Sequence, residues 1–512
     1  MFSRLFKPMG LKTASIVLSL STFCSYFLGF FRDKTLAYFF GQNGLTDVYN
    51  LAFTIPDFIF NFCIAGALTG VFIPIFIAHK EDGQEKADEL ASIFLSVMGV
   101  FITVICLIAW ILTPWIMDQL LVHKDQLETS VNLTRIMLLS PIILGLSNTV
   151  GSIHIAYKHF FAYSISAVMY NLGIILGIIF FYRWFGIYSA AIGVIIGALL
   201  HASIRLFDLK HVPFTFKWNF TLQHPGFRKI LLSMLPRSLG LVSITAVTFF
   251  CGIMGPSLIK GGFTAYTYAR NFQSFPVNFF GITLATAVLP LISEFVHKKD
   301  HTGLSERMNT SLRQLVFLTI PAAVALSVLA PAVISVLRGG AFSAEDAVLT
   351  STLLMILAIS IPFESLTHLY TRGFNAYQNT YFPAITNVIF AVIAITIILF
   401  TKDLFGVYSF ALGWMSGATV QFLILFFSFH FVFKFGSLYI TPLLISIIKV
   451  TVTCAVMWTG LFFFFKYVPA NVLTLVGGTS IGIALFFAVS YLLKAEEMEA
   501  LKPIVARFLP KK

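Results

Sequence analysis

The sequence predicts an all-α polytopic membrane protein with 14 transmembrane helices, arranged as two parallel-repeat six-helix bundles plus two C-terminal helices. Three observations predict this fold: an extreme apolar composition, apolar runs of span length, and an internal repeat. Of the 512 residues, 58% are hydrophobic and 11% are charged, and the mean hydropathy is +0.89. Soluble domains contain about 45–50% apolar and about 25% charged residues, so a water-soluble fold is excluded.

Apolar runs long enough to cross a hydrocarbon core of about 30 Å recur along the chain. Lipid offers no partner to backbone N–H and C=O groups, so we expect each run to be helical. The first run follows three basic residues but lacks the small-residue cleavage site of a signal peptide, and we expect it to be retained. The expected spans cover residues 12–31, 48–78, 90–117, 131–157, 160–182, 185–207, 229–253, 264–296, 309–337, 347–371, 380–400, 405–433, 440–465 and 470–493.

The distribution of basic residues predicts the orientation of these spans. With the N-terminus in the cytoplasm, 22 of the 34 Lys and Arg residues fall in or beside cytoplasmic loops and 8 lie on the opposite side. Lys and Arg resist translocation across the membrane. We therefore expect an inner-membrane, multi-pass protein with both termini cytoplasmic. The formal charge of +12 is explained by these loops and by anionic lipid headgroups, and does not indicate a nucleic-acid partner.

An internal repeat with an offset of 220 residues divides the chain. FGIYSAAIGVIIGA at 185–198 aligns with FGVYSFALGWMSGA at 405–418, and AYKHFF at 156–161 aligns with AYQNTY at 376–381. Six expected spans separate the copies, so the halves share one orientation, and a duplicated transporter binds its cargo between its halves. The predicted domains are an N-terminal bundle at 1–210, a second bundle at 211–435, and the last two spans with a cytoplasmic tail at 436–512.

Ionisable residues inside expected spans are the candidate binding residues, because each costs about 2.5–3.5 kcal/mol at membrane depth unless it faces a cavity or a partner. Basic groups outnumber acidic groups among them, which favours an anionic cargo. Arginine is the residue expected opposite phosphate, since its planar guanidinium binds two oxygens at once. The candidate substrate-binding residues are Arg32, Asp47, Arg237 and Arg270, and the further cavity charges are Asp57, Arg135 and Glu364.

No motif predicts an enzyme. The sequence contains no Walker loop, no His/Cys metal cluster and no nucleophile elbow. The longest cytoplasmic loop, about 208–228, carries Asp208 as its only carboxylate, and His154, His159 and His201 are read as separate helix-end residues. A membrane-embedded transferase would need an acidic or histidine constellation near the interface.

Two long stretches resemble a known family. LGFFRDKTLAYFFGQNGLTDVYNLAFTIPDFIFN at 28–61 with GALTGVFIPIF at 66–76, and YARNFQSFPVNFFGITLATAVLPLIS at 268–293, are similar to the MurJ/MviN lipid II flippases of the MOP transporter superfamily. The resemblance covers essentially the whole chain. Arg32, Asp47 and Arg270 match the family's cavity positions on spans 1, 2 and 8. The sequence departs from the family pattern at Tyr26, Phe60 and Ala269.

The resemblance implies a flippase for lipid II in cell-wall synthesis, working by alternating access. The undecaprenyl tail would stay in lipid along a groove lined by spans 13 and 14. Arg237 would restore some of the missing cationic charge, and Asn387 is a candidate ligand for the sodium site of some relatives. No cofactor is expected beyond the membrane potential or a monovalent cation. The implied partners are lipid II or a related undecaprenyl-pyrophosphate lipid, the membrane, and a cell-wall synthesis complex.

Three other functions compete with this interpretation. One is a flippase for another lipid-linked oligosaccharide of the O-antigen or exopolysaccharide type. Another is a MATE-like cation or drug antiporter, which should favour carboxylates over arginines inside the membrane. The third is a scaffold without transport, which would leave the intramembrane arginines without a purpose.

Overall fold

A computed structural model gives the fold and describes residues 8–65, 71–121 and 124–498. The described residues form helices, with one isolated backbone bridge between Gly339 and Phe342 and no strand. Their contacts divide the chain into two compact units. The first comprises Met1–Thr264 with Gly339–Phe342, and the second comprises Ala265–Arg338 with Ser343–Lys512.

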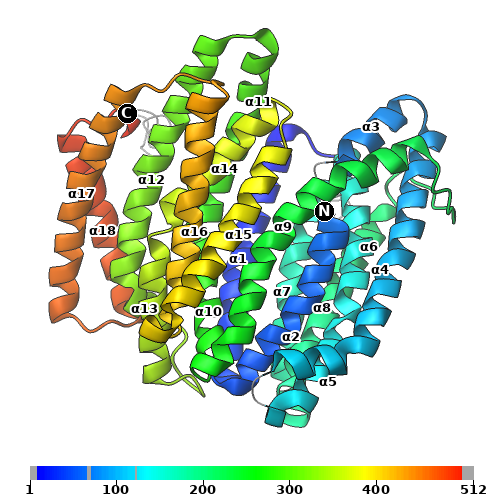
Figure 1. The fold of residues 1–512 in the computed structure, drawn as a ribbon, viewed down its shortest axis with the longest axis horizontal. Coiled ribbons are helices and arrows are strands. Elements are labelled where there is room, and N and C mark those ends of the chain that lie inside the picture. Colours follow the sequence, from blue (N-terminus) through cyan, green and yellow to red (C-terminus); the bar gives the residue numbers. More distant parts are fainter. Residues whose placement is uncertain (1–7, 66–70, 122–123, 499–512) are drawn as a thin grey trace, which may run out of the picture. The chain divides into compact units, whose positions relative to one another are not determined.

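The first unit packs around a core of buried aliphatic and aromatic side chains from α2, α3, α4, α6 and the start of α9, including Phe72, Phe76 and Phe94. The helices of this unit are shown in blue to green in Figure 1. They are α1 (Leu11–Phe40), α2 (Gly44–Phe60) with the π-helical η2 (Asn61–Ala65), α3 (Ile73–Glu81), α4 (Gln84–Leu120), η4 (Lys124–Gln126), α5 (Leu127–Met137), α6 (Leu139–Ala156), α7 (Phe160–Phe185), α8 (Tyr188–Leu209) and α9 (Pro225–Leu258).

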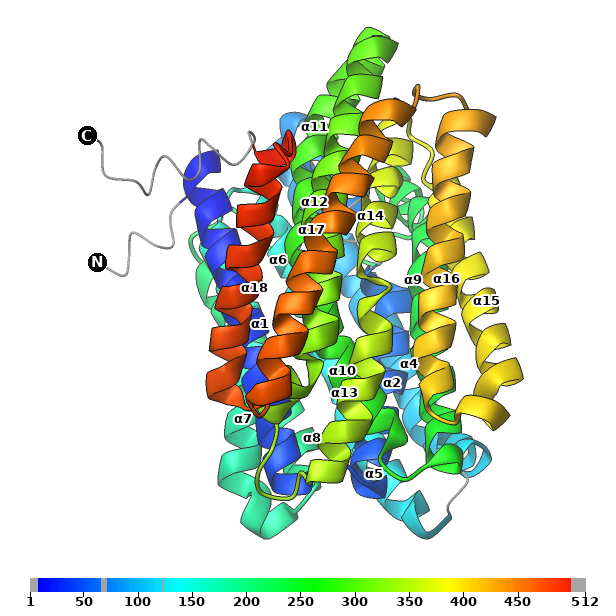
Figure 2. The ribbon, with the colours of Figure 1, turned by 90° about the vertical axis from the view of Figure 1, so that its left-hand side faces the viewer.

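The second unit has two apolar clusters. One joins α11, α12, α14 and α16, and the other joins α12 to the final helices α17 and α18. Figure 2 shows α17 and α18 beside α12. The helices are α10 (Gly262–Pro276, which starts in the first unit), η5 (Val277–Ile282, π-helical), α11 (Thr283–Lys298), α12 (His301–Ser335), α13 (Ala344–Ala358), α14 (Ile361–Ala376), α15 (Tyr381–Phe405), α16 (Tyr408–Phe427), η6 (Ser428–Val432, π-helical), α17 (Ile440–Tyr467) and α18 (Val472–Leu492).

Within the described residues, eleven helical stretches are long and apolar enough to cross a membrane, and α13 with α14, bent by 44°, would make twelve. The chain is therefore a multi-pass α-helical membrane protein. The expected first span falls on α1, and the expected second span is shared by α2, η2 and α3. Residues 66–70 of that span lie outside the described residues, as does the expected tail beyond residue 498. The total of fourteen spans stays a prediction.

Prolines at matching positions of the repeat interrupt two helices in the same way. Pro56 precedes η2 in the first unit and Pro276 precedes η5 in the second. Proline has no N–H to donate to the carbonyl four residues earlier, so the helix loosens at that point. Wider π-helical turns are a common response and often mark functional positions.

The repeat is visible in two helical hairpins, α7–α8 and α15–α16. Gly186 and Gly406, 220 residues apart, end α7 and α15 with φ of 51° and 54°. Lys158 and Gln378, at the same offset, have φ of 64° and 59°. Matching left-handed residues indicate that the two copies share local backbone geometry. The duplication of complete six-helix bundles stays a prediction.

The packing boundary differs in position from the predicted domain boundary. The repeat places a boundary between residues 210 and 211, whereas contacts group α9 with the first unit and divide the chain after Thr264. α9 packs on α2 and η2. The repeat reflects a duplication of sequence, whereas the contacts reflect packing. The contact-based division therefore does not test the predicted domain boundaries.

Candidate functional site

Arg270 is held on the second unit by an aromatic ring and an acidic group. Its guanidinium carbon lies 3.8 Å from the centre of the Trp414 ring. Its Nη1 donates to Gln273 Oε1 and lies 3.4 Å from Glu364 Oε1. A guanidinium stacked on an indole combines cation–π attraction with a fixed ring plane. Arg270 is thereby oriented without being enclosed, and its side chain stays 20% exposed.

Glu364 is the acceptor at the centre of this cluster. Its Oε1 accepts hydrogen bonds from Ser360 Oγ (2.6 Å), Gln273 Nε2 (2.7 Å) and Trp414 Nε1 (2.9 Å), besides its contact with Arg270. Four donors on one carboxylate oxygen fix it firmly. In contrast, Nε and Nη2 of Arg270 make no hydrogen bond within the described chain, which leaves two guanidinium donors available to a bidentate anion.

Arg32 in α1 is more fully engaged than Arg270. Its Nε and Nη2 donate to Asp33 Oδ1 at 3.1 and 2.9 Å, and its Nη1 donates to Asn171 Oδ1 of α7 at 3.3 Å. Its side chain is 25% exposed, whereas that of Asp33 is 3% exposed. An anion that binds Arg32 would have to compete with Asp33.

Asp57 lies near Arg32 in the same unit. It is an exposed carboxylate in the middle of a long apolar helical stretch, and the Arg32 charge is close enough to act on it. No hydrogen bond or ion pair to Asp57 is present among the described residues. The structure therefore pairs Arg270 with Glu364 in the second unit, and in the first unit it places Asp57 within electrostatic range of Arg32.

Asp47 has a different environment. It is fully buried at the start of α2, and its carboxylate accepts from the backbone N–H of Gly261 (2.7 Å), the backbone N–H of Thr264 (2.8 Å) and the Thr264 hydroxyl (2.8 Å). Carboxylates that accept from first-turn N–H groups cap helices. This geometry gives Asp47 a structural role as the cap of α10, and its predicted contact with substrate has no support in the packing.

The other candidates lie on α5, α9 and α15. Arg135, in the last turn of α5, stacks on Trp110 at 4.3 Å and donates to the Trp110 carbonyl oxygen. Arg237 lies half-buried in α9. Asn387 accepts a 2.5 Å hydrogen bond from Gln421 Nε2. No group of three or more His, Cys, Asp or Glu side chains that could hold a metal occurs in the described ranges.

Sequence reasoning did not single out Arg205, which falls within the expected span 185–207. It is 3% exposed in α8 and donates to Ser166 Oγ, the Ser147 carbonyl oxygen, Asn148 Oδ1 and the Tyr163 carbonyl oxygen at 2.9–3.3 Å. The available signal was its spacing of four from His201, which places both on one face of α8. His201 also lies on that face, 2.8 Å from Ser147 Oγ.

The interpretation of His154 and His159 as separate residues was wrong, because both contact Asp208. Asp208, 1% exposed, lies 3.3 Å from both His154 Nε2 and His159 Nδ1, and 3.5 Å from His211 Nδ1. These residues belong to α6, the α6–α7 turn and the end of α8. The three segments meet only when the helices pack together.

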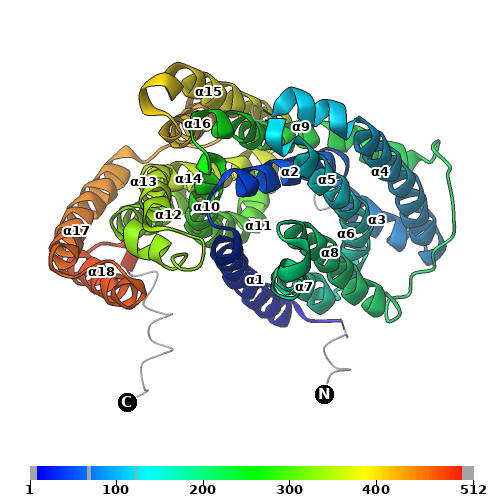
Figure 3. The ribbon, with the colours of Figure 1, turned by 90° about the horizontal axis from the view of Figure 1, so that it is seen from below.

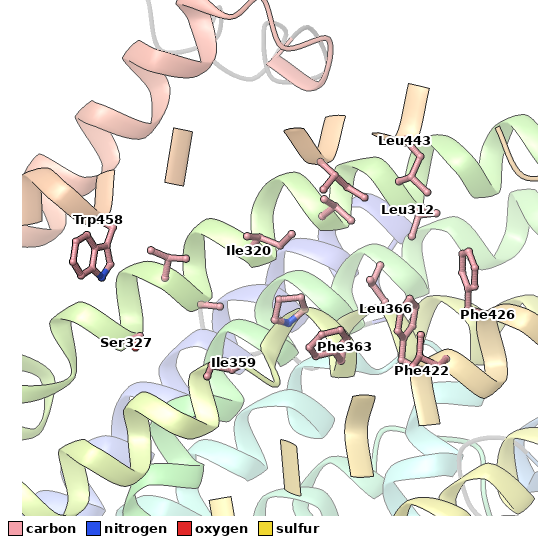
Figure 4. A pocket seen from close by; sticks show the side chains of 16 residues that line it. Leu312, Ile320, Ser327, Ile359, Phe363, Leu366, Phe422, Phe426, Leu443 and Trp458 are labelled. Atoms are coloured by element: carbon pink, nitrogen blue, oxygen red, sulfur yellow. The ribbon is translucent and has the colours of Figure 1, made fainter. Parts of the chain in front are cut away.

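An apolar pocket lies within the second unit, between α12, α14, α16 and α17, with a volume of about 560 Å³. Figure 4 shows its lining, in which Phe363, Phe422 and Phe426 face Leu312 and Leu443. Fifteen of the sixteen lining side chains are apolar or aromatic, and Ser327 is the exception. Pro362 and Phe363 of this lining are neighbours of Glu364 in the chain, so the pocket adjoins the charged cluster along α14.

Comparison with known proteins identifies a family. Residues 36–502 match the family described as "Lipid II flippase MurJ". A "Probable lipid II flippase MurJ" of Borreliella burgdorferi is 27% identical over 89% of this chain and 90% of its own length. Another of the same name from Aquifex aeolicus is 29% identical over 78% of this chain and 80% of its own length.

Solved structures share the fold. A structure of "Lipid II flippase MurJ, inward closed conformation" superposes with a TM-score of 0.79 at 22% identity, over 94% of this chain and all of that chain. An inward-facing multidrug resistance MATE family transporter of the MOP superfamily gives 0.67 at 14% identity, over 86% of this chain and 98% of that chain. At these identities the likeness shows the fold alone.

Proposed function

This chain belongs to the MurJ family of lipid II flippases, and from that premise we propose that it moves lipid II across the inner membrane by alternating access. The family consists of transporters, so the chain is not an enzyme. The single observation that carries the proposal beyond the family is Arg270, whose guanidinium is oriented by Trp414 yet keeps two free donors.

Arg270 suits the pyrophosphate of the cargo. A diphosphate presents paired oxygens, and guanidinium donors bind such pairs in a planar, bidentate manner. Glu364 holds the side chain through Oε1, so the incoming anion would meet a preoriented partner. Arg32 and Arg237 are the further residues that we assign to headgroup binding, and Asp57 is a further charge beside Arg32. A cation or drug antiporter has no comparable use for an exposed intramembrane arginine.

The apolar pocket suits the lipid tail. It is lined by α12, α14, α16 and α17, and nearly every lining side chain is apolar. The sequence-based expectation placed the tail on spans 13 and 14, which correspond to α17 and α18. We propose α17 for this role, since α18 contributes no lining residue. Because lipid is as apolar as the pocket, van der Waals contacts with the lining side chains would hold the tail there.

We also propose that both termini are cytoplasmic and that the membrane potential contributes to transport. A potential of 100 mV is worth about 2.3 kcal/mol for each charge moved, which is sufficient to bias a two-state carrier. A monovalent cation remains the alternative coupling agent. Contact with a cell-wall synthesis complex is a further proposal, which follows only from the cargo.

Complementation tests the proposal. A strain depleted of its own lipid II flippase should grow when it carries this chain, and Arg270→Ala should abolish that growth because the preoriented cation is lost. Arg270→Lys should restore growth only in part, since an ammonium group cannot bind in bidentate fashion. Lys298→Ala is the matched control, because Lys298 is an exposed cation at the end of α11.

Two outcomes would contradict the proposal. If membrane expression is confirmed and the unaltered chain does not support growth, the cargo is another lipid-linked oligosaccharide. If the Arg270→Ala variant supports growth as well as the Lys298→Ala variant, the assignment of Arg270 fails. Undiminished flipping by Arg237→Ala would remove Arg237 from the headgroup site.

A further inference from the structure

Residues 213–220, which we call the strap, connect α8 to α9 in an extended conformation. Figures 1 and 3 show this segment as a thin green trace beside α4. The strap lies outside the charged clusters and the apolar pocket, and the proposed transport function does not use it. Both its backbone and its side chains show a regular pattern.

The backbone of the strap is bonded to one face of α4. The N–H groups of Thr215, Lys217 and Asn219 donate to Asp88 Oδ2 (3.1 Å), Ser92 Oγ (3.1 Å) and Ser96 Oγ (3.3 Å). Two residues of extended chain rise by about 6.6 Å, and four residues of helix rise by about 6.0 Å. The two repeats nearly match, so the register persists over three consecutive hydrogen bonds.

The side chains of the strap form one aromatic and one polar face. Alternate residues of an extended chain point to opposite sides. Phe216, Trp218 and Phe220 therefore share a face, with exposed fractions of 41%, 72% and 55%. Phe216 meets Trp218 edge to face at a centroid distance of 5.1 Å, and Trp218 stacks on Phe220 at 6.0 Å. Thr215, Lys217 and Asn219 form the opposite face, so the strap is an amphipathic strand.

The position of the strap along α4 indicates its depth in the membrane. α4 has 37 residues, or about 55 Å, whereas the hydrocarbon core is about 30 Å thick. The exposed apolar face of α4 runs from Val100 to Trp115. Between Leu90 and Gly99, where the strap is bonded, α4 has no exposed residue. The strap thus begins where the lipid-facing surface of α4 ends.

Unpaired backbone N–H groups further limit how deep in the bilayer the strap can lie. The N–H groups of Phe216, Trp218 and Phe220 have no partner in the described part of the chain. Each such group would cost several kcal/mol in hydrocarbon, but it can be hydrated among lipid headgroups. Aromatic side chains are enriched at that level of the bilayer. Exposed Lys210, Lys217, Arg228 and Lys229 add positive charge, which complements anionic lipids.

We propose that the strap is an interfacial anchor that docks on the headgroup layer of the bilayer where α4 enters the membrane. Its aromatic face points toward the acyl chains, and its Thr215–Lys217–Asn219 face points toward water. The hydrogen bonds to Asp88, Ser92 and Ser96 hold the strand flat against α4. The anchor would thereby fix the height of α4 relative to the membrane surface.

Fluorescence quenching tests the location of Trp218. In lipid nanodiscs, the fluorescence of Trp218 is obtained by subtracting the emission of the Trp218→Phe variant from that of the unaltered chain. Lipids brominated near the headgroup should quench it at least twofold more than acrylamide does, and anionic lipids should strengthen this quenching. The emission of Trp458, obtained in the same way from Trp458→Phe, is the matched reference, because Trp458 is 47% exposed on α17. If acrylamide quenches Trp218 and brominated lipids do not, the strap faces the aqueous phase and docks no membrane.

Amide exchange tests the bonding pattern independently. In nanodiscs the amides of Thr215, Lys217 and Asn219 should exchange at least tenfold more slowly than those of Phe216, Trp218 and Phe220. The double variant Ser92→Ala/Ser96→Ala should remove the protection of Lys217 and Asn219, while Ser203→Ala, an exposed serine of α8, should not. Equal exchange at all six amides of the unaltered chain would overturn the proposal that α4 holds the strap.

Discussion

At the scale of single residues, the two units treat their arginines differently. Arg32 donates hydrogen bonds to Asp33 and Asn171, whereas Arg270 shares Glu364 Oε1 with three other donors and keeps two donors free. Glu364 thus acts as an internal anion that orients the cation without saturating it. A bound diphosphate would compete with Glu364 for Arg270, so the carboxylate influences both affinity and release.

Glu364→Gln tests this competition. The amide removes the negative charge beside Arg270, and we expect lipid II to bind roughly 5–30-fold more tightly, which corresponds to about 1–2 kcal/mol. Turnover should fall, because release of the headgroup becomes slower. Binding in detergent and flipping in proteoliposomes measure the two effects. Glu306→Gln, at an exposed position of α12, is the control. Unchanged binding would show that Glu364 has no part in headgroup affinity.

The Asp47→Asn variant distinguishes a role of Asp47 in capping α10 from a role in binding substrate. The three donors to its carboxylate come from Gly261 and Thr264, and an amide nitrogen turned toward one of them cannot accept. We expect a loss of about 1–3 kcal/mol in stability and a lower Tm in detergent. The remaining folded protein should bind lipid II with an unaltered Kd. A changed Kd at normal Tm would instead make Asp47 a substrate contact.

At the scale of elements, glycine contacts build the repeated hairpins. A Cβ on Gly177 of α7 would lie 2.2 Å from Cα of Gly193 in α8, and in the second copy a Cβ on Gly413 would lie 2.6 Å from the Ala394 carbonyl oxygen. Small residues let membrane helices approach closely, which is the main source of packing energy where lipid is as apolar as the protein. The hairpins are therefore rigid parts of each unit.

Gly177→Ala should separate α7 from α8. The added methyl group meets backbone that cannot move aside, and we expect a cost of about 1–3 kcal/mol. Gly29→Ala in α1 is the matched control, since no atom lies within 4 Å of its Cβ, and alanine there should be neutral or stabilising by up to about 1 kcal/mol. Thermal unfolding in one detergent compares the two. Equal Tm values would exclude close packing as the reason for Gly177.

At the scale of the whole molecule, the chain after α18 is fastened back to the second unit. Arg313 of α12 donates to Glu497 Oε1 (2.8 Å) and Glu496 Oε2 (2.7 Å), and Lys449 of α17 donates to the Lys494 carbonyl oxygen (2.9 Å). Glu497 is buried at 7% exposure. These bonds join the segment after α18 to both α12 and α17, and these two helices line the apolar pocket. The fastening should therefore limit how far the pocket can open.

Arg313→Ala should loosen this fastening. It leaves the buried Glu497 without its donor, at a cost of about 1–3 kcal/mol, and amide exchange in residues 490–498 should accelerate.

Hydrogen bonding to Arg313 and the Arg313 charge lower the pKa of Glu496. A lowered pKa stabilises the folded state above the ordinary glutamate value of about 4.3, and this contribution is lost as the pH falls through the lowered pKa. The Tm difference between the unaltered chain and Glu496→Gln should accordingly vanish in acid.

The sequence by itself determined the class of the protein. Composition and run length required membrane helices, because bilayer thickness and backbone desolvation leave few alternatives. The internal repeat located two hairpins whose backbone geometry is the same. Intramembrane charge singled out Arg270 and Glu364, since such residues are costly without a function. The family followed from motifs longer than any fold-level pattern.

Tertiary structure decided which charged groups meet and which of them serve packing. Asp47 caps α10, Arg205 is buried among polar groups of α6 and α7, and the histidines around Asp208 come from three separate segments. The strap along α4 depends on hydrogen bonds between segments more than 120 residues apart. The sequence shows which polar and charged residues are unfavourable inside a membrane. Only the packing of the helices determines which partner offsets the free-energy cost of each one.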